Sequence, residues 1–261
     1  MTFRWPFSQP TYRSAAIPPD ERVYAIGDIH GEAALFAILL ARIEQDSLMR
    51  GSAHTRIILL GDIIDRGARS ADLVSVLMRT EDARLMVLKG NHEAALVDAY
   101  RGDEQALGFW LHFGGIATLR SFGFDEGEDI TAFTSSDLLS IVHEHIAEDI
   151  IDWLDGLPLK LEVGDYFFTH AGIRPGVALA RQSIDDLLWI REPFLSSRRD
   201  HGKVIVHGHT IDTGPVALGG TRIGLDTGAC DGGRLTALGL QANDQWIIEA
   251  RSDEASAADG G

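Results

Sequence analysis

Short apolar runs alternate with amphipathic stretches through the first hundred residues. Each run has the length of a strand and is followed by a glycine that precedes Asp or Asn, and each following stretch carries apolar side chains at helical spacing. Repeated strand and helix units of this kind favour a largely parallel sheet with outer helices. The expected strands are residues 22–26, 56–60 and 84–88, and the expected helices are residues 33–43, residues 70–78 and a helix from Glu93.

The pattern changes in the second half of the chain. Residues from about 104 to 156 keep helical spacing and predict a helical insert beside the sheet. Strand-like runs dominate afterwards, and Gly164-Asp165 between two of them is a pair favoured in tight hairpin turns. We therefore expect an α/β fold in which a two-sheet β-sandwich is flanked by helices (α/β/β/α). The later strands are expected at residues 159–163, 166–169, 204–206, 221–225, 235–240 and 245–250.

The two ends of the chain differ from this central part. Four of the eight prolines fall within residues 1–20, which predicts an extended N-terminal arm. Residues 252–261 are small, polar and acidic, which predicts a disordered tail. A single domain is therefore expected over residues 21–251.

Charge and cysteine content exclude several functional classes. Asp and Glu outnumber Lys and Arg by 39 to 23, for a formal net charge of -16, so we expect no nucleic-acid partner bound through phosphate contacts. Cys230 is the only cysteine, which excludes an intrachain disulfide and fits a reducing compartment. No apolar run reaches the roughly 18 residues of a membrane span. These features predict a cytoplasmic enzyme with no membrane partner.

Polar residues with metal-ligand chemistry follow five of the expected strands. Open α/β sheets bind ligands at the carboxyl ends of their strands, so these side chains are expected to lie close together. Two divalent ions need a bridging carboxylate, for which Asp62 is our candidate, and a water between the ions becomes a hydroxide that can attack phosphorus. Oxygen and imidazole donors suit manganese, our expectation, as well as iron or zinc. The candidate ligands are Asp28 and His30 on one ion, Asp62 on both, and Asn91, His170 and His209 on the other.

Three sequence blocks around these residues resemble the signature blocks of PPP-type serine/threonine protein phosphatases of the bacterial and bacteriophage type, within the calcineurin-like metallophosphoesterase superfamily. The blocks are residues 27–31 (GDIHG), 61–67 (GDIIDRG) and 90–93 (GNHE). Residues 170–172 (HAG) and 208–210 (GHT) look like the two later ligand blocks. Residues 189–192 (WIRE) look like the segment that supplies a phosphate-binding arginine.

The resemblance also implies roles for the residues beside the ligands. His92 matches the general acid that protonates the leaving oxygen, and Asp65 matches the carboxylate that orients it. Arg66 and Arg191 match the arginines that bind the phosphate oxygens, and Asn91 can also donate to the phosphate. The implied activity is that of a metal-dependent phosphomonoesterase acting on phosphoserine and phosphothreonine in proteins.

Two other functions stay open on the sequence. The first is symmetrical bis(5'-nucleosyl)-tetraphosphate hydrolysis, or hydrolysis of another small phosphoester; that enzyme group usually has Gln where His30 stands and lacks the Asp of the Asp65-Arg66 pair. The second is an inactive phospho-binding module, against which Asp65 and His92 argue because binding requires no general acid. Phe113 stands where bacterial relatives often carry Asn, which leaves the substrate preference open.

Eight further residues have ordinary structural interpretations. His207 is expected to support the metal site or the fold rather than bind an ion. Arg174 can reach a substrate or an acidic loop, and we expect it at the rim of the site. Asp226 can hydrogen-bond a ligand histidine or form a plain turn. The histidines outside the blocks are expected on the surface or in the core; they are His54, His112, His143, His145 and His201.

Overall fold

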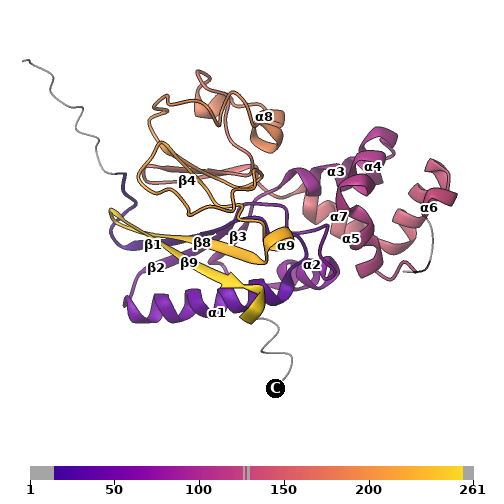
Figure 1. Cartoon of the computed structure of the whole chain (residues 1–261), viewed down its shortest axis with the longest axis horizontal. Coiled ribbons are helices and arrows are strands. Elements are labelled where there is room, and N and C mark those ends of the chain that lie inside the picture. Colours follow the sequence, from indigo (N-terminus) through magenta and orange to yellow (C-terminus); the bar gives the residue numbers. More distant parts are fainter. Residues whose placement is uncertain (1–14, 126, 128–129, 255–261) are drawn as a thin grey trace, which may run out of the picture.

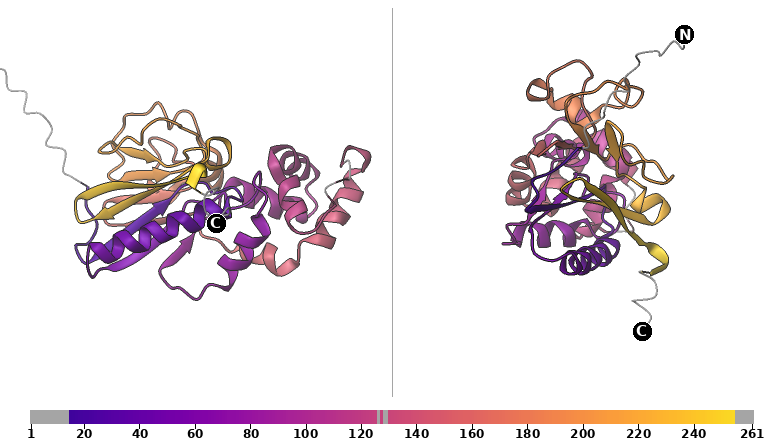
Figure 2. Two further views of the ribbon diagram at one scale, coloured as in Figure 1. Left: turned by 60° about the horizontal axis from the view of Figure 1, so that its bottom comes forward. Right: turned by 90° about the vertical axis from the view of Figure 1, so that its left-hand side faces the viewer.

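The computed structural model describes residues 15–125, 127 and 130–254. Two β-sheets stack face to face, helices α1 and α2 lie on the outer side of one sheet, and α8 lies on the outer side of the other (Figure 1). A group of helices projects from one end of the sheets, as a second view also shows (Figure 2). The α/β fold with two sheets flanked by helices is confirmed.

The first sheet has five strands in the order β3-β2-β1-β8-β9. β1, β2 and β3 pair in parallel, and β8 and β9 add an antiparallel hairpin. This half contains the repeated strand and helix units that the apolar pattern predicts. Its strands are β1 (Glu21–Ile26), β2 (His54–Leu59), β3 (Leu85–Val87), β8 (Arg234–Gln241) and β9 (Asp244–Arg251), and its helices are α1 (Ala33–Met49) and α2 (Ser70–Arg79).

The second sheet has four strands in the order β4-β5-β6-β7. β4 and β5 form an antiparallel hairpin whose turn is Gly164-Asp165, as expected, because Val163 pairs with Tyr166. β5, β6 and β7 pair in parallel. The elements are β4 (Lys160–Val163), β5 (Tyr166–Thr169), β6 (Val204–His207), β7 (Arg222–Gly224), a 3-10 turn (Leu179–Arg181), α8 (Ile184–Trp189) and α9 (Ala229–Gly232).

The central strand β1 is buried on both faces. Val23 and Ala25 belong to the apolar cluster between the two sheets, whereas Tyr24 and Ile26 belong to the cluster beneath α1. A strand covered on both sides carries a continuous apolar run, and this explains why residues 22–26 lack alternation. Because β1 is packed on both faces, its end is held in place, and so is the start of the polar loop that follows it.

Helix α3 (Asn91–Tyr100) follows β3, and the helical insert comes after it. α3 begins two residues before the expected start, because the Glu93 carboxylate accepts the Gly90 N–H at 2.8 Å and caps the helix. A kink at Phe113 and Gly114 separates two later helices, and Gly114 has a φ of 120°. The elements are α3 (Asn91–Tyr100), α4 (Glu104–Trp110), a π-turn (Leu111–Gly115), α5 (Ile116–Ser121), a 3-10 turn (Ile130–Ala132), α6 (Ser135–His145) and α7 (Glu148–Asp155).

The described ends of the chain both attach to the sheets. The Ala16 N–H donates to Asp165 at 3.1 Å, and the side chain of Ile17 is buried. Residues 252–254 form a helical turn, in which Glu254 pairs with Arg42 at 2.9 Å. The expected disorder therefore does not begin at residue 252. Residues 1–14 of the expected arm and 255–261 of the expected tail lie outside the described residues.

Within the described residues, no helix combines the length and the apolar character that crossing a bilayer requires.

Candidate metal centre

Asp62 lies at the centre of a buried cluster of histidines. Its Oδ2 atom is 3.4 Å from His170 Nε2, 3.7 Å from His30 Nε2 and 3.8 Å from His92 Nε2. Two groups of possible ligand atoms share this carboxylate, and within each group all atoms lie within 4.8 Å of one another: Asp62 with His30 and His92, and Asp62 with His170 and His209. Asp62 therefore has the position that a bridging carboxylate requires.

Asn91 joins the second group. Its Oδ1 atom is 2.7 Å from His170 Nε2 and 2.9 Å from His209 Nδ1. Asn91 reaches this position because α3 begins at this residue, so that its side chain projects from the first turn of the helix. An amide oxygen and two imidazole nitrogens that converge on one point form a donor set suited to a divalent ion.

Backbone carbonyls orient two of the histidine rings. Nδ1 of His30 is 2.9 Å from the Ile64 carbonyl oxygen, and Nδ1 of His170 is 2.9 Å from that of Leu60. A carbonyl only accepts, so each Nδ1 carries the proton and each Nε2 presents a lone pair to the cluster. Burial lowers the pKa of His30 to about 3 and that of His209 also to about 3, which keeps both rings neutral. Neutral imidazoles are the form that binds metal ions.

Three buried carboxylates crowd this region. Both oxygens of Asp28 accept the His209 N–H, at 3.2 and 3.0 Å. Burial, and then the charges of Asp226 and Asp62, raise the pKa of Asp28 well above its usual range. Asp28 is in neither of the two groups around Asp62, but its charge acts on the same cluster. The crowded carboxylates and the lone pairs of the histidines fit bound cations.

The loops that carry these residues are held in unusual backbone conformations. Six of the described residues other than glycine have a positive φ, and five of them belong to the candidate site. Such conformations persist only where the surrounding structure imposes them, and they concentrate at functional sites. The five are His30, Asp62, Asp65, Arg66 and His209, with φ values of 48°, 49°, 72°, 66° and 62°.

Glu93 fixes the loop of Asp62 against α3. Its buried carboxylate accepts four backbone N–H groups, from Gly90 and Asp62 at 2.8 Å each, from Ile63 at 2.9 Å and from Ile64 at 3.3 Å. Burial and the Asp62 charge raise the pKa of Glu93 to about 7, whereas the N–H donors favour the ionised form. The strand pattern implies no role for Glu93, although a Glu three residues after an N-cap residue, here Gly90, is part of a known capping signal.

Asp65 and His92 are in direct contact. Asp65 Oδ2 lies 2.6 Å from His92 Nδ1, as the resemblance implied. Two residues of the insert, Trp110 and Thr118, donate to the other carboxylate oxygen at 3.0 and 2.6 Å. Burial lowers the pKa of His92, but the charge of Asp62 and the hydrogen bond to Asp65 outweigh it and raise that pKa to about 9. The raised pKa favours the protonated ring, and Nε2 of His92 lies 3.8 Å from Asp62 Oδ2.

The insert also holds Arg66. The Arg66 N–H donates to the Gly114 carbonyl at 3.2 Å, and a Cβ atom at Gly114 would lie only 2.7 Å from Arg66 Cγ. Only glycine fits this kink, where φ is positive and the backbones approach closely. The Arg66 guanidinium lies 3.5 Å from His92 Nε2. The structure therefore places Arg66 beside the contact between Asp65 and His92.

The charge of Arg191 acts on two histidines of the cluster. Arg191 is exposed in the segment that follows α8, and its charge contributes to lowering the pKa values of His170 and His209 after the larger effect of burial. Trp189 lies two residues earlier, and its ring centroid is 6.4 Å from that of His209. The structure thus brings Arg191 near the second ligand group.

The structure shows the contacts of Arg174, Asp226 and His207, for which the sequence allows more than one role. Arg174 pairs with Asp186 through two hydrogen bonds of 3.0 and 2.6 Å, which favours the acidic-loop interpretation over a substrate contact. Asp226 accepts the Gly228 N–H at 3.1 Å, as a turn residue does. His207 is buried, and its ring packs 5.1 Å from Phe194. None of the three is in the ligand groups formed by the described residues.

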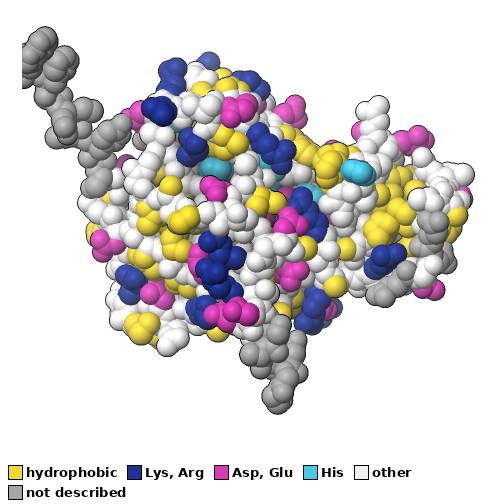
Figure 3. Space-filling model, in the orientation of Figure 1, with side chains coloured by type: hydrophobic (Ala, Val, Ile, Leu, Met, Phe, Trp, Pro, Cys, Tyr) yellow, Lys and Arg dark blue, Asp and Glu magenta, His cyan; other side chains and the backbone are white. Residues whose placement is uncertain are grey.

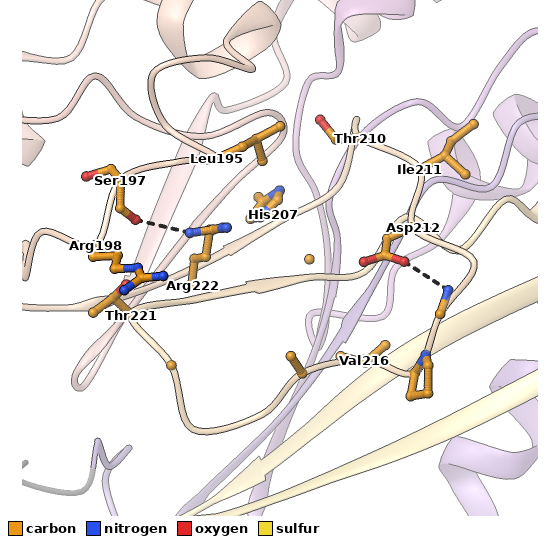
Figure 4. A pocket seen from close by; sticks show the side chains of 15 residues that line it. Leu195, Ser197, Arg198, His207, Thr210, Ile211, Asp212, Val216, Thr221 and Arg222 are labelled. Carbon is orange, nitrogen blue, oxygen red and sulfur yellow. Dashed lines mark hydrogen bonds between the residues drawn. The ribbon is translucent and has the colours of Figure 1, made fainter.

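A cavity of about 560 Å³ lies next to this centre, between the segment after α8 and the loop that follows His209 (Figure 4). Its wall includes His207 and Thr210, the neighbours of the ligand residues in the sequence, but no member of the Asp62 cluster. The cavity is therefore distinct from the candidate metal centre.

Comparisons with known proteins agree with this geometry. Residues 21–231 match the family model of calcineurin-like phosphoesterases. Serine/threonine-protein phosphatase 1 of Salmonella typhimurium is 26% identical over 230 residues, which cover 84% of this chain and 92% of that protein. The symmetrical bis(5'-nucleosyl)-tetraphosphatase of Neisseria meningitidis serogroup A is 30% identical over 155 residues, 58% of this chain, but the match spans less than half of that enzyme, 44%.

Solved structures show the same fold at low sequence identity. A putative diadenosine tetraphosphatase superposes with a TM-score of 0.63 at 21% identity, covering 91% of this chain and 99% of that one. A cold-active protein-tyrosine phosphatase of a Shewanella species superposes with a TM-score of 0.55 at 18% identity, covering 90% of this chain and 83% of that one.

The family match implies divalent metal ions, and the Asp62 cluster offers residues that fit them. The chain therefore belongs to the calcineurin-like phosphoesterase family and is a metal-dependent phosphoesterase.

Proposed function

We propose that this enzyme is a phosphomonoesterase that dephosphorylates phosphoserine and phosphothreonine in proteins. The observation that carries the proposal is the 2.6 Å contact between Asp65 and His92 next to Asp62. The alkoxide of serine or threonine is a strongly basic leaving group and needs a proton as the P–O bond breaks. A leaving nucleotide phosphate is already stable as an anion, so a dedicated acid favours the alkyl phosphoester.

Two divalent ions are proposed to occupy the cluster, with manganese as the expected metal because the donors are oxygens and imidazoles. Bound ions of this kind lower the pKa of a coordinated water and draw charge from the phosphate oxygens. Asp62 would contact both ions. The remaining ligands are proposed to be Asp28 and His30 for one ion and Asn91, His170 and His209 for the other.

The other site residues would act directly on the phosphate and the leaving group. Asp65 accepts a hydrogen bond from Nδ1–H of His92, so the proton on Nε2 can pass to the leaving oxygen. Arg66 and Arg191 would bind the non-bridging phosphate oxygens through their planar guanidinium groups. The almost complete overlap with the Salmonella protein phosphatase supports the same assignment.

Substrates with different leaving groups test the proposal. The manganese-loaded enzyme should release phosphate from phosphoserine peptides and from p-nitrophenyl phosphate, whose phenolate leaves readily. His92→Asn should slow the peptide reaction by at least about 10²-fold and the p-nitrophenyl phosphate reaction much less. His112→Asn, outside the cluster, is the matched control. Binding of the phosphopeptide without turnover would instead indicate an inactive phospho-binding module.

Symmetrical dinucleoside tetraphosphate hydrolysis is a second candidate, and a row of aromatic rings favours it. The Phe109 ring lies 4.4 Å from that of Phe113 and 5.0 Å from that of Trp189. Phe113 is 45% exposed beside the kink that holds Arg66, and Trp189 is 37% exposed beside His209. Exposed rings next to a phosphate-binding arginine are suited to stacking nucleobases. The structural likeness to a putative diadenosine tetraphosphatase is compatible with this candidate.

The two candidates differ in their response to loss of the rings. Stacking of one base contributes about 1–3 kcal/mol, so Phe113→Ala and Trp189→Ala should each slow diadenosine tetraphosphate cleavage by roughly 5- to 150-fold if that is the substrate. Phosphopeptide hydrolysis should change far less. Ile184→Ala, which removes another exposed apolar side chain from α8, is the matched control. Faster cleavage of diadenosine tetraphosphate than of any phosphopeptide would overturn the protein phosphatase assignment.

A further inference from the structure

The cavity beside the metal centre has a basic side and an apolar side. One side carries Arg198 and Arg222, and the other carries Ile211 and Val216 (Figure 4). Arg222 extends from β7, the edge strand of the second sheet, whereas Ile211 and Val216 belong to the loop that follows His209. At about 560 Å³ the cavity is large enough for a drug-sized organic molecule.

The two arginines on one side are close to each other and lack acidic partners. Arg222 Nη1 donates to the carbonyl of Ser197, the residue directly before Arg198, at 3.2 Å. Within the described part of the chain, neither guanidinium forms an ion pair with a carboxylate, although acidic residues outnumber basic ones by 39 to 23. Two neighbouring cations without a counter-charge are stabilised by an anion, and guanidinium groups match phosphate oxygens in geometry.

The segment around the cavity also carries a net positive charge. Residues 191–224 contain five Lys or Arg and three Asp or Glu, the reverse of the balance in the whole chain. Lys and Arg side chains gather over the upper part of the molecule in Figure 3, above the second sheet. The one carboxylate in the cavity wall, Asp212, accepts the Gly214 N–H at 2.9 Å within its own turn, on the side opposite the arginines (Figure 4).

The opposite half of the wall is suited to an organic group. Ile211 is 41% exposed, which is unusual for a large apolar side chain, and Val216 stands beside it in the cavity wall. Thr210 also contributes to the wall, and its buried Oγ1 atom has no hydrogen-bond partner among the described residues. A bound molecule that covers Ile211 and accepts or donates a hydrogen bond at Thr210 would satisfy both groups.

We propose that this cavity binds a small organic phosphate of about the size of a nucleoside monophosphate. Arg198 and Arg222 hold its phosphoryl group, and Ile211 and Val216 contact its apolar body. The bound group is either the distal part of a phosphorylated substrate or a separate small molecule that regulates the enzyme. Because Thr210 directly follows His209, occupancy of the cavity can be transmitted to the metal centre through one peptide bond. The inference does not depend on which phosphoester is hydrolysed.

Calorimetry on the manganese-loaded full-length enzyme tests the site. The probe is an adenosine 5'-monophosphate analogue in which a methylene group replaces the ester oxygen, so that it cannot be hydrolysed. Charge-assisted hydrogen bonds contribute about 1.5–3 kcal/mol, so Arg198→Ala and Arg222→Ala should each weaken probe binding by roughly 10- to 150-fold. Arg199→Ala is the matched control, because Arg199 neighbours Arg198 but is outside the cavity wall. Arg198→Ala should hydrolyse p-nitrophenyl phosphate as fast as the unsubstituted enzyme does. Equal turnover verifies that the variant is folded.

One further variant, Arg191→Ala, locates the probe, and the kinetics of Arg198→Ala identify the source of the ligand. Arg191→Ala should leave probe binding unchanged; loss of binding in Arg191→Ala but not in Arg198→Ala would place the probe at the metal centre and overturn the proposal, as would no binding at all. If the cavity is part of the substrate site, Arg198→Ala raises KM for the phosphopeptide or for diadenosine tetraphosphate, whichever of the two the enzyme hydrolyses, without changing kcat for p-nitrophenyl phosphate. If it binds a regulator, the probe alters p-nitrophenyl phosphate turnover in the unsubstituted enzyme and not in Arg198→Ala.

Discussion

The candidate site is built from two regions that differ in origin. The Asp62 cluster comes from loops at the ends of buried strands, where glycines and left-handed backbone conformations direct the side chains inward. The contacts around Asp65 and Arg66 come from the helical insert, through Trp110, Thr118 and Gly114. The first region offers metal ligands, and the second positions a proton donor and a guanidinium. Metal binding and proton transfer should therefore be separable by substitution.

The largest effect is expected at Asp62, which belongs to both ligand groups. Asp62→Asn removes the negative charge shared by the histidines while keeping the shape of the side chain. Because metal ions supply several kcal/mol of transition-state stabilisation, kcat/KM for p-nitrophenyl phosphate should fall by about 10³-fold or more. Steady-state assays at saturating manganese measure this loss. Activity within tenfold of the unsubstituted enzyme would mean that the cluster is not the reaction centre.

A smaller loss with intact metal binding is expected at His92. His92→Asn removes the proton donor but none of the proposed ligands, so kcat for phosphoserine peptides should fall by roughly 10²- to 10⁴-fold while metal content stays unchanged. Elemental analysis of the same preparation measures the metal content and shows whether the ions are retained. Loss of metal together with loss of activity would show that His92 is itself a metal ligand. Its position close to His30 and Asp62 is compatible with that role.

The insert should control catalysis without touching the ligands. Thr118→Val keeps the shape of a buried side chain but removes the 2.6 Å hydrogen bond to Asp65. An unmet hydrogen bond at a buried carboxylate costs about 1–3 kcal/mol, so kcat for phosphoserine peptides should fall by roughly tenfold with little change in metal content. Thr118→Ser restores the hydroxyl and should restore kcat. Equal activity of the Val and Ser variants would show that Asp65 needs no support from the insert.

The smallest effect is expected at Arg174. Its exposed guanidinium already pairs with Asp186, and exposed ion pairs contribute little to stability. Arg174→Ala should change kcat/KM for phosphopeptides by less than about twofold, whereas Arg191→Ala should lower it by at least tenfold. Parallel kinetic assays of the two variants distinguish a surface contact from a phosphate contact. A loss in Arg174→Ala as large as that in Arg191→Ala would restore the substrate-contact interpretation of Arg174.

The same contrast between regions explains what the sequence could predict. Asp62 and Asn91 follow β2 and β3, which are neighbouring parallel strands, and the ends of such strands meet at one edge of a sheet, so their proximity follows from the pattern alone. His170 follows β5 of the second sheet, so its approach to Asp62 depends on how the two sheets stack. The two-sheet fold and the Gly164-Asp165 hairpin were predictable for similar local reasons. The pairing of Asp65 with His92 and the place of Arg191 required the resemblance to a known family, because neither follows a strand directly.

The supporting contacts lie beyond what local patterns specify. Thr118 is 53 residues and Trp110 45 residues from Asp65, and the apolar spacing of the insert predicts helices but not where they dock. Glu93 has the signature of a helix cap, yet its bonds to Ile63 and Ile64 depend on how α3 packs against the Asp62 loop. The cavity wall combines the segment after α8, strand β7 and the loop after His209, and no local pattern predicts that these segments meet.

The central claim is that Asp62 is shared by two divalent ions, and the number of ions per chain tests it most directly. Elemental analysis of the purified full-length protein, loaded with manganese and then freed of unbound metal, should give two ions per chain for the unsubstituted enzyme and loss of at least one ion in Asp62→Asn. One ion or none in the unsubstituted enzyme, or two ions retained in Asp62→Asn, would contradict the claim.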